Sequence, residues 1–325
     1  MSSLRNLLRT MALAGMSAAL IAPTAAAHAE PSPAELTQRI ETSSAELERV
    51  VESYNKLREE IKANEAAAGR LQTRIGPLEQ QVEQSRADVA ELATTAYKSG
   101  GLRTADALLR PGGSSALLDR LGALEQLTRQ RQERISGFTA DQQRLLDEKT
   151  RLEATLARQA AQARELAAGK KRIEQDLARL YELRRQAYGA ATERPEPKVA
   201  AAEAKNVPAV AGAAGTAVRY AFGALGKPYQ WASDGPNGYD CSGLTSAAWR
   251  AAGKSLPHNT RMQWSAVAHI GRSDLSPGDL VFYSGLGHVA LYVGNGQVID
   301  APSAGRNVLK RGMNMMPIQG YGRVR

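Results

Sequence analysis

Residues 280–301 read LVFYSGLGHVALYVGNGQVIDA, and this stretch predicts the fold of the C-terminal part of the chain. Residues 280–283, 288–293 and 297–301 are rich in β-branched and aromatic side chains, as is typical of strands. Between the last two, Gly294-Asn295-Gly296 predicts a tight hairpin, because glycine and asparagine adopt the backbone angles that such turns need. The stretch therefore predicts an antiparallel sheet.

Two helices are expected before this sheet, at residues 217–224 and 241–252. In the second one, apolar and small residues recur at helical spacing, from Cys241 and Leu244 to Ala248 and Ala252. A final strand is expected near residues 321–324. Helices followed by an antiparallel sheet indicate an α+β domain, and about 110 residues are enough to bury one core.

Cys241 is the only cysteine of the chain, and it lies at the start of the second helix. A thiol attacks a carbonyl as the thiolate, and the positive end of a helix favours that anion. His288 opens a strand and could take the thiol proton. Two other histidines have weaker contexts, since His258 lies in a polar turn and His269 in a short segment. We therefore predict a reactive Cys241 with His288 as its base; the alternative is a buried structural cysteine.

A base histidine also needs an acceptor that orients its second ring nitrogen. The hairpin at residues 294–296 would bring positions 288 and 300 together across neighbouring strands. Asp300 is therefore the candidate orienting residue. The alternative is a carboxylate on an edge strand that faces water.

Residues 33–187 have a different sequence pattern, in which apolar residues recur at heptad-like spacing among strong helix formers. Two groups of helix stops, at residues 99–101 and 111–113, divide this region into two long arms. An antiparallel helical hairpin is the simplest fold for them, and a parallel dimer is the alternative. Gly76-Pro77 is expected to kink or interrupt the first arm. The short piece at residues 102–109 is expected to pack on the hairpin.

The N-terminus is typical of a secretory signal. Arg5 and Arg9 precede an apolar run, and Ala27-His28-Ala29 provides a small-x-small cleavage site. An uncleaved signal-anchor is the alternative. The expected organisation is a signal peptide (1–29), a helical coiled-coil hairpin (30–190), an Ala/Pro-rich linker (191–213) and an α+β domain (214–325). The expected location is secreted or cell-wall associated, outside the cytoplasmic membrane.

The formal charge is +9, and removal of residues 1–29 would leave +7. A basic exported protein is attracted to anionic surfaces such as wall polymers; general solubility is the alternative role of this charge. Nucleic acid is not expected as a partner, because the basic residues are interleaved with acids and no zinc-finger pattern occurs. The sequence has no HExxH motif or clustered Cys and His, so no metal or other cofactor is expected for the reaction.

Four segments of the C-terminal part resemble the NlpC/P60 family. They read GKPYQW (226–231), GPNGYDCSGL (235–244), LSPGDLVFY (275–283) and HVALYVGNG (288–296). The resemblance implies a papain-like cysteine peptidase that cuts peptidoglycan stem peptides, commonly between D-γ-glutamate and a diamino acid. It implies Cys241 as nucleophile, His288 as base and Asp300 as the third polar residue, at a position where the family varies.

The same resemblance places Tyr229 beside the nucleophile, and Asp240 and Ser242 at the substrate site. Ala232-Ser233 departs from the family, which usually has Gly-Gly there. The alternatives are a non-catalytic wall-binding scaffold at the division site, or an amidase or acyltransferase on the same fold.

The helical part is similar to the coiled-coil region of division-associated wall hydrolases. This implies docking on a membrane complex that contains FtsX. A long hairpin on an extended linker is also expected to cover the cleft, so residues 208–325 alone should cut faster than the mature chain.

Overall fold

The computed structural model describes residues 32–99, 114–191 and 207–325 of the chain. The predicted signal peptide (1–29), the segment 102–109 and most of the predicted linker lie outside the described residues. Within the described ranges, no helix combines the length and the apolar character that a membrane span requires.

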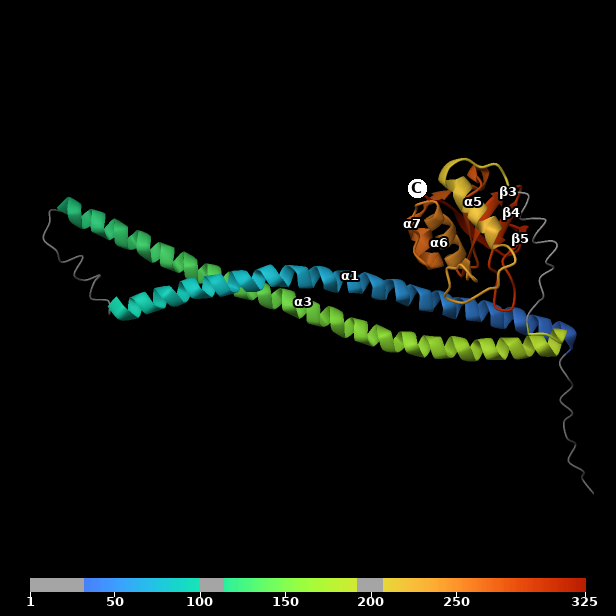
Figure 1. The fold of residues 1–325 in the computed structure, drawn as a ribbon, viewed down its shortest axis with the longest axis horizontal. Coiled ribbons are helices and arrows are strands. Elements are labelled where there is room, and N and C mark those ends of the chain that lie inside the picture. The colour runs from blue at the N-terminus through green and yellow to red at the C-terminus, as the bar shows by residue number, and fades with distance from the viewer. Residues whose placement is uncertain (1–31, 100–113, 192–206) are drawn as a thin grey trace, which may run out of the picture.

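Two long helices form an antiparallel hairpin, α1 (Pro33–Ser99) and α3 (Ser114–Tyr188) (Figure 1). Apolar side chains line the seam between them, as the heptad-like spacing predicts. The buried ones include Leu36, Ile40, Leu47, Leu71 and Ile75 from α1 and Ile173 and Leu180 from α3. The predicted antiparallel hairpin is confirmed.

Of the two predicted effects of Gly76-Pro77, an interruption is wrong, because α1 continues through Pro77 as one helix, and a kink stays a prediction. A proline removes one backbone hydrogen bond from a helix and crowds the preceding turn. Ion pairs join α1 to α3 on both sides of Pro77. Arg74 pairs with Glu148 at 3.1 Å on one side, and Glu79 pairs with Lys149 at 2.7 Å on the other.

The C-terminal domain, residues 212–325, consists of three α-helices and one six-stranded sheet. The helices are α5 (Gly212–Ala224), α6 (Cys241–Ala251) and α7 (Thr260–Ala266), with a short 3-10 helix η1 (Arg272–Asp274). The strands are β1 (Ala268–Ile270), β2 (Leu280–Tyr283), β3 (His288–Gly294), β4 (Gln297–Asp300), β5 (Leu309–Gly312) and β6 (Ile318–Arg323).

All strand pairs are antiparallel, and the strand order is β1-β6-β2-β3-β4-β5. The centre of the sheet is thus the β2-β3-β4 meander that residues 280–301 predicted. α5 and α6 pack against β3, and Phe222, Leu244 and Leu291 are buried between these elements. The predicted α+β class is confirmed, whereas α7, β1 and β5 were not predicted.

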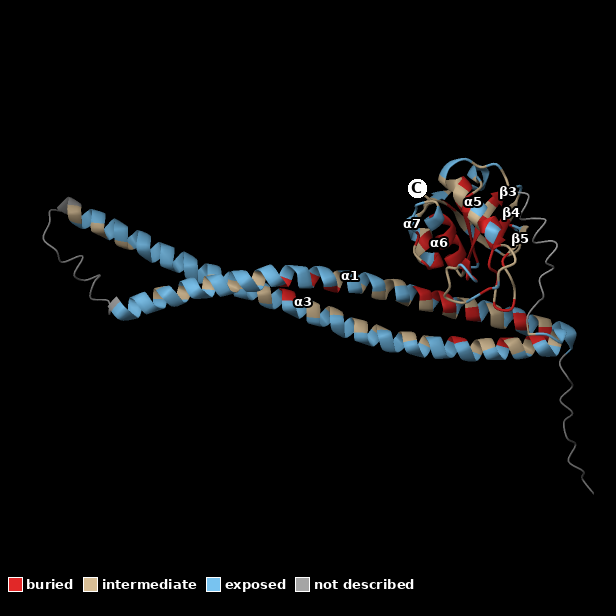
Figure 2. Ribbon diagram, viewed as in Figure 1, coloured by how far each residue is buried: buried red, intermediate tan, exposed pale blue. Residues whose placement is uncertain are grey.

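The first half of α1 lies against the C-terminal domain. Figure 2 shows buried positions on this part of α1, while the far half of the hairpin is largely exposed. Some of these buried positions are polar, namely Glu52 (6% exposed) and Asn55 (1% exposed). Polar side chains on a helix are rarely buried without partners, so α1 must meet polar groups of the domain here.

Candidate active site

Cys241 begins α6, and its neighbours explain why the helix starts there. Asp240 is in an extended conformation and caps the helix, because its Oδ1 accepts a hydrogen bond from the Gly243 amide at 2.7 Å. A side chain at Gly243 could not fit, since a Cβ would lie 2.1 Å from the Ser233 carbonyl oxygen. The cap and the close approach of Gly243 fix the position of the Cys241 thiol, which is buried.

His288 and Asp300 lie on neighbouring strands and are in contact, as the hairpin predicted. His288 Nε2 is 2.7 Å from Asp300 Oδ2. The alternative of a water-facing edge carboxylate is wrong, because Asp300 is fully buried and β4 lies between β3 and β5.

Arg311 on β5 also holds the Asp300 carboxylate, through both of its oxygens. Its Nε donates to Asp300 Oδ1 at 2.9 Å, and its Nη2 donates to Oδ2. Burial alone would raise the pKa of Asp300, but the hydrogen bonds and charges of His288 and Arg311 lower it. Asp300 is therefore an ionised acceptor of fixed orientation.

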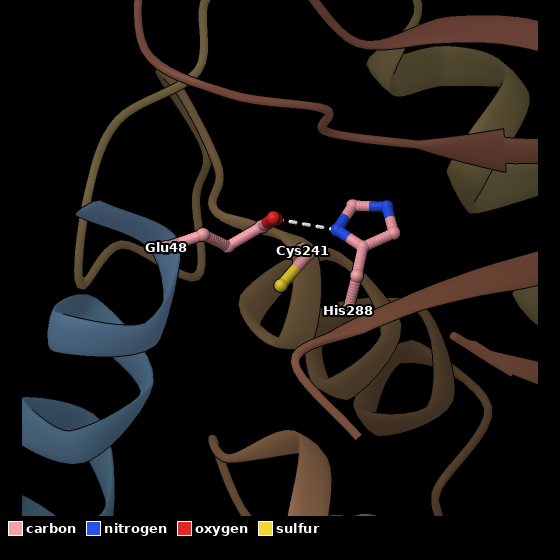
Figure 3. A group of neighbouring side chains, drawn as sticks. All are labelled: Glu48, Cys241 and His288. Atoms are coloured by element: carbon pink, nitrogen blue, oxygen red, sulfur yellow. Dashed lines mark hydrogen bonds and ion pairs between the residues drawn. The ribbon is translucent and has the colours of Figure 1, made fainter. Parts of the chain in front are cut away.

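The second ring nitrogen of His288, Nδ1, contacts a side chain of α1. Glu48 Oε1 lies 2.5 Å from His288 Nδ1. Figure 3 shows Glu48, from α1, reaching the histidine next to the Cys241 sulfur. One carboxylate oxygen, the sulfur and Nδ1 all lie within 4.8 Å of one another. Glu48 thus takes the position from which His288 would accept the thiol proton.

Glu52, one turn further along α1, enters the site beside the nucleophile. Its carboxylate accepts hydrogen bonds from Ser242 Oγ (2.6 Å), the Thr260 amide (2.6 Å) and Asn259 Nδ2 (2.9 Å). It also lies 3.7 Å from the Cys241 sulfur. Burial and the nearby Asp240 charge raise the pKa of Glu52 to about 7.

Contacts continue along α1 for two more turns. Asn55 Nδ2 donates to Asp240 Oδ2 at 2.9 Å, and Arg58 donates to the carbonyl oxygen of Ala232 at 2.9 Å. The Tyr54 ring meets Trp231 edge-on, with centroids 5.4 Å apart. We call this arrangement, in which α1 fills the site, the closed form.

In the closed form the expected thiolate at Cys241 is disfavoured, so that expectation is wrong for this arrangement. Burial raises the pKa of the thiol well above its usual range, and the charges of Glu52, Glu48 and Asp240 raise it further. These effects outweigh the favourable helix start. Burial also disfavours a charged His288, but Glu48 and Asp300 together raise its pKa to about 10.

The structure brings the other predicted site residues together as well. Tyr229 is buried, and burial and the Asp240 and Glu48 charges raise its pKa. Sequence reasoning missed His258, whose Nε2 lies 2.7 Å from Asp240 Oδ1. Burial disfavours the imidazolium of His258, but Asp240 raises its pKa overall.

The residues on α1 were also missed. Glu48, Glu52 and Asn55 recur at spacings of four and three, which puts them on one polar face beside the apolar seam. That pattern is also typical of a helix face in water, so on its own it did not indicate that these residues enter the active site.

Comparison with known proteins gives a family match within the C-terminal domain. Residues 226–320 match the NlpC/P60 family. A "Probable endopeptidase" of Corynebacterium glutamicum (strain R) is 40% identical over 132 residues, which are 40% of this chain and 60% of the relative. A "Probable endopeptidase p60" of Listeria monocytogenes is 46% identical over 84 residues, which are 25% of this chain and 17% of the relative.

The chain therefore spans less than two thirds of the length of these relatives. Among solved structures, the NlpC/p60 domain of the peptidoglycan hydrolase SagA is 31% identical. The match covers 34% of this chain and 98% of that one, with a TM-score of 0.32. The family match falls on the domain that carries Cys241, His288 and Asp300, and we conclude that this C-terminal domain belongs to the NlpC/P60 family.

Proposed function

We propose that this chain is a peptidoglycan endopeptidase that α1 holds in a closed form. One observation carries the proposal: His288 is fixed by Asp300 on one ring nitrogen, and the Cys241 sulfur lies within 4.8 Å of the imidazole. A nucleophile, a base and an orienting acceptor in this order are what acyl transfer by a thiol requires. The printed names of the relatives, which are endopeptidases and a peptidoglycan hydrolase, support the substrate class.

The reaction begins once α1 withdraws and Glu48 leaves His288 Nδ1. His288 then takes the proton of Cys241, and the thiolate attacks the peptide carbonyl carbon. Backbone amides at the start of α6 stabilise the oxyanion. The imidazolium protonates the leaving amine, which departs and leaves an acyl-enzyme. His288 then removes a proton from water, whose oxygen attacks the thioester and releases the acid and the thiol.

The groups that hold Glu52 indicate how the substrate binds. Ser242, Asn259 and Thr260 direct three hydrogen-bond donors at one carboxylate. A D-γ-glutamyl linkage leaves the α-carboxylate of that residue free, so it could replace the Glu52 carboxylate when α1 withdraws. This fit supports the D-γ-glutamyl–diamino acid bond as the site of cleavage.

α1 controls this reaction by occupying both halves of the site. Glu48 blocks the base, and Glu52 fills the donor cradle beside the nucleophile. Burial and the charges of the same two glutamates also raise the pKa of the Cys241 thiol and so disfavour the thiolate. The contacts of Tyr54, Asn55 and Arg58 add to the stability of the closed form.

The far end of the hairpin is the proposed partner surface. Large apolar side chains there are exposed, including Tyr97 (90%), Leu118 (69%) and Leu127 (51%). Their distance from the domain lets a partner pull on α1 without touching the site (Figure 1). The proposed partner is an FtsX-containing membrane complex, which requires export of the chain to the cell wall.

Digestion of purified sacculi, followed by mass spectrometry of the released muropeptides, tests the reaction. We expect new D-glutamate carboxyl ends and diamino acid amino ends from the wild-type chain, and none from Cys241→Ala. Loss of the amide between the sugar and the stem would indicate an amidase. Binding to sacculi without new ends would indicate a scaffold. Undiminished cleavage by Cys241→Ala would refute the proposed nucleophile.

A further inference from the structure

The closed form brings together three metal-binding groups from three elements. Glu48 comes from α1, Cys241 from α6 and His288 from β3, and their ligand atoms all lie within 4.8 Å of one another (Figure 3). Sulfur, imidazole nitrogen and carboxylate oxygen are the three protein ligand types that Zn²⁺ takes, at about 2.0–2.3 Å. Magnesium and calcium take oxygen ligands instead, so this set favours zinc.

The distances are close to those of a loaded site. In a tetrahedral zinc site the ligand atoms are separated by about 3–4 Å. Atoms at most 4.8 Å apart must approach by about 1 Å, and the Glu48 oxygen, 2.5 Å from His288 Nδ1, must move away from it by about 1 Å. Cys241 and His288 are fixed by α6 and β3, but Glu48 is the partly exposed end of a flexible side chain and can adjust.

The surroundings of His288 also suit a metal ligand. Metal-bound histidines usually donate their other ring N–H to a carboxylate, which fixes the tautomer and makes the ligand more basic. Asp300 is in this position at 2.7 Å, and Arg311 holds Asp300 in turn. His288 Nδ1 is thereby directed at the point where Glu48 and Cys241 converge.

Nearby negative charge favours a cation at the same point. The carboxylates of Glu52 and Asp240 lie close to Cys241 and are not among the three ligands. Glu48 also lines a cavity of about 500 Å³ between the hairpin and the domain.

We propose that the closed form binds one Zn²⁺ ion through Glu48, Cys241 and His288, with water as the fourth ligand. The metal replaces the protons on the thiol and on Nδ1. Because Glu48 belongs to α1 and the other two ligands to the domain, the bound ion joins the hairpin to the domain. Zinc is thus an inhibitor that stabilises the closed form, in contrast to the metal-free reaction.

Calorimetric titration of the metal-stripped mature chain with Zn²⁺ tests this directly and requires no catalysis. We expect one ion per chain. Glu48→Gln should weaken binding at least as much as loss of an indirect metal contact does, about 10–100-fold. Glu41→Gln is the matched control, because this exposed glutamate on α1 lines the same cavity and contacts none of the three ligands. It should retain the wild-type affinity.

Binding of Co²⁺ in place of Zn²⁺ gives a second measurement, which compares the wild-type chain with Cys241→Ser, a variant in which oxygen replaces the sulfur atom. Co²⁺ bound to the wild-type chain should show a thiolate-to-cobalt absorption band, and Cys241→Ser should abolish it. Absence of one-to-one binding would overturn the proposal. Equal affinity of the wild-type chain and Glu48→Gln would also overturn it, because the ion would then bind the domain without joining α1. Neither result depends on whether the chain cleaves peptidoglycan.

Discussion

Replacing Glu52 by alanine should release α1 from the active site. The variant loses three hydrogen bonds, from Ser242 Oγ (2.6 Å), the Thr260 amide (2.6 Å) and Asn259 Nδ2 (2.9 Å). At about 1 kcal/mol each, their loss disfavours the closed form by about 3 kcal/mol. That corresponds to about a 150-fold shift of the closed–open equilibrium. Glu52 is buried beside the Asp240 charge, which is unfavourable, so its removal relieves part of this cost of about 3 kcal/mol. We therefore expect the closed–open equilibrium to shift toward the open form by about 10-fold to 150-fold.

The assay is the rate at which iodoacetamide alkylates Cys241 in the full chain, followed by intact mass. Cys241 is buried in the closed form, so the rate follows the open fraction. Removing a carboxylate also makes the thiol more reactive by itself. Glu52→Gln controls for this, because it removes the same charge but keeps hydrogen-bonding groups in the cradle. Glu46→Ala controls for changes on α1, since Glu46 is exposed and pairs only weakly with Arg172 at 3.5 Å.

We expect rapid alkylation of Glu52→Ala, a smaller increase for Glu52→Gln that reports the loss of charge alone, and a nearly wild-type rate for Glu46→Ala. Equal rates for Glu52→Ala and Glu52→Gln would show that only the charge matters and would refute the argument from hydrogen bonds. A wild-type rate in Glu52→Ala would refute the role of Glu52 in closure.

Three further predictions concern pH, the base and the α1 contact. The pKa of Glu52 is about 7 in the closed form and ordinarily 4.5, so closure takes up a proton. With a chelator present, protection of Cys241 from alkylation should therefore be strongest at low pH and weaken as pH rises from 4.5 to about 7. The same dependence of protection on pH in Glu52→Gln would contradict this. Arg311→Met removes the cation that shares the Asp300 carboxylate with His288, so the pKa of His288 should rise. The alkaline limb of the pH profile of kcat/KM should move to higher pH, with about a 10-fold loss of activity, and Arg311→Lys should recover part of that activity. An unshifted limb would argue against a positioning role for Arg311. Tyr54→Ala loses the edge contact with Trp231, about 1 kcal/mol, and should alkylate about fivefold faster; an unchanged rate would mean that this contact adds nothing to closure.

Most of the C-terminal domain could be predicted from local patterns. Strand alternation and the Gly294-Asn295-Gly296 turn define β3 and β4, and their pairing places Asp300 beside His288. Cys241 follows the Asp240 cap at a clear helix start. These features depend on residues that are close in sequence, so they are visible without a structure.

The contacts between α1 and the domain could not be predicted in the same way. Glu48 and His288 are separated by 240 positions, and Glu52 and Ser242 by 190. No local pattern distinguishes a polar helix face in water from one that fills an active site. The expected cover over the cleft could be proposed from the length of the hairpin, but its residues could not be named. The pKa of Cys241 was misjudged for this reason, because the carboxylates that raise it come partly from α1.

Pro77 shows the opposite case, in which a strong local rule was overruled. A proline in the middle of a helix predicts a break. Here α1 nevertheless continues through Pro77, and on both sides of it ion pairs join α1 to α3, Arg74–Glu148 and Glu79–Lys149. The seam with α3, where Leu71 and Ile75 are buried just before Pro77, is a contact that the local pattern does not include.

The central claim is that α1 closes the active site of a Cys241 peptidase. The most direct measurement compares the mature chain with residues 208–325 alone on the same sacculi, as cleavage rate per molecule. We predict that residues 208–325 cut at least about 10-fold faster, in keeping with the loss of the Glu52 hydrogen bonds alone, and that Cys241→Ala abolishes cleavage in both. Equal rates for the two chains would contradict closure by α1.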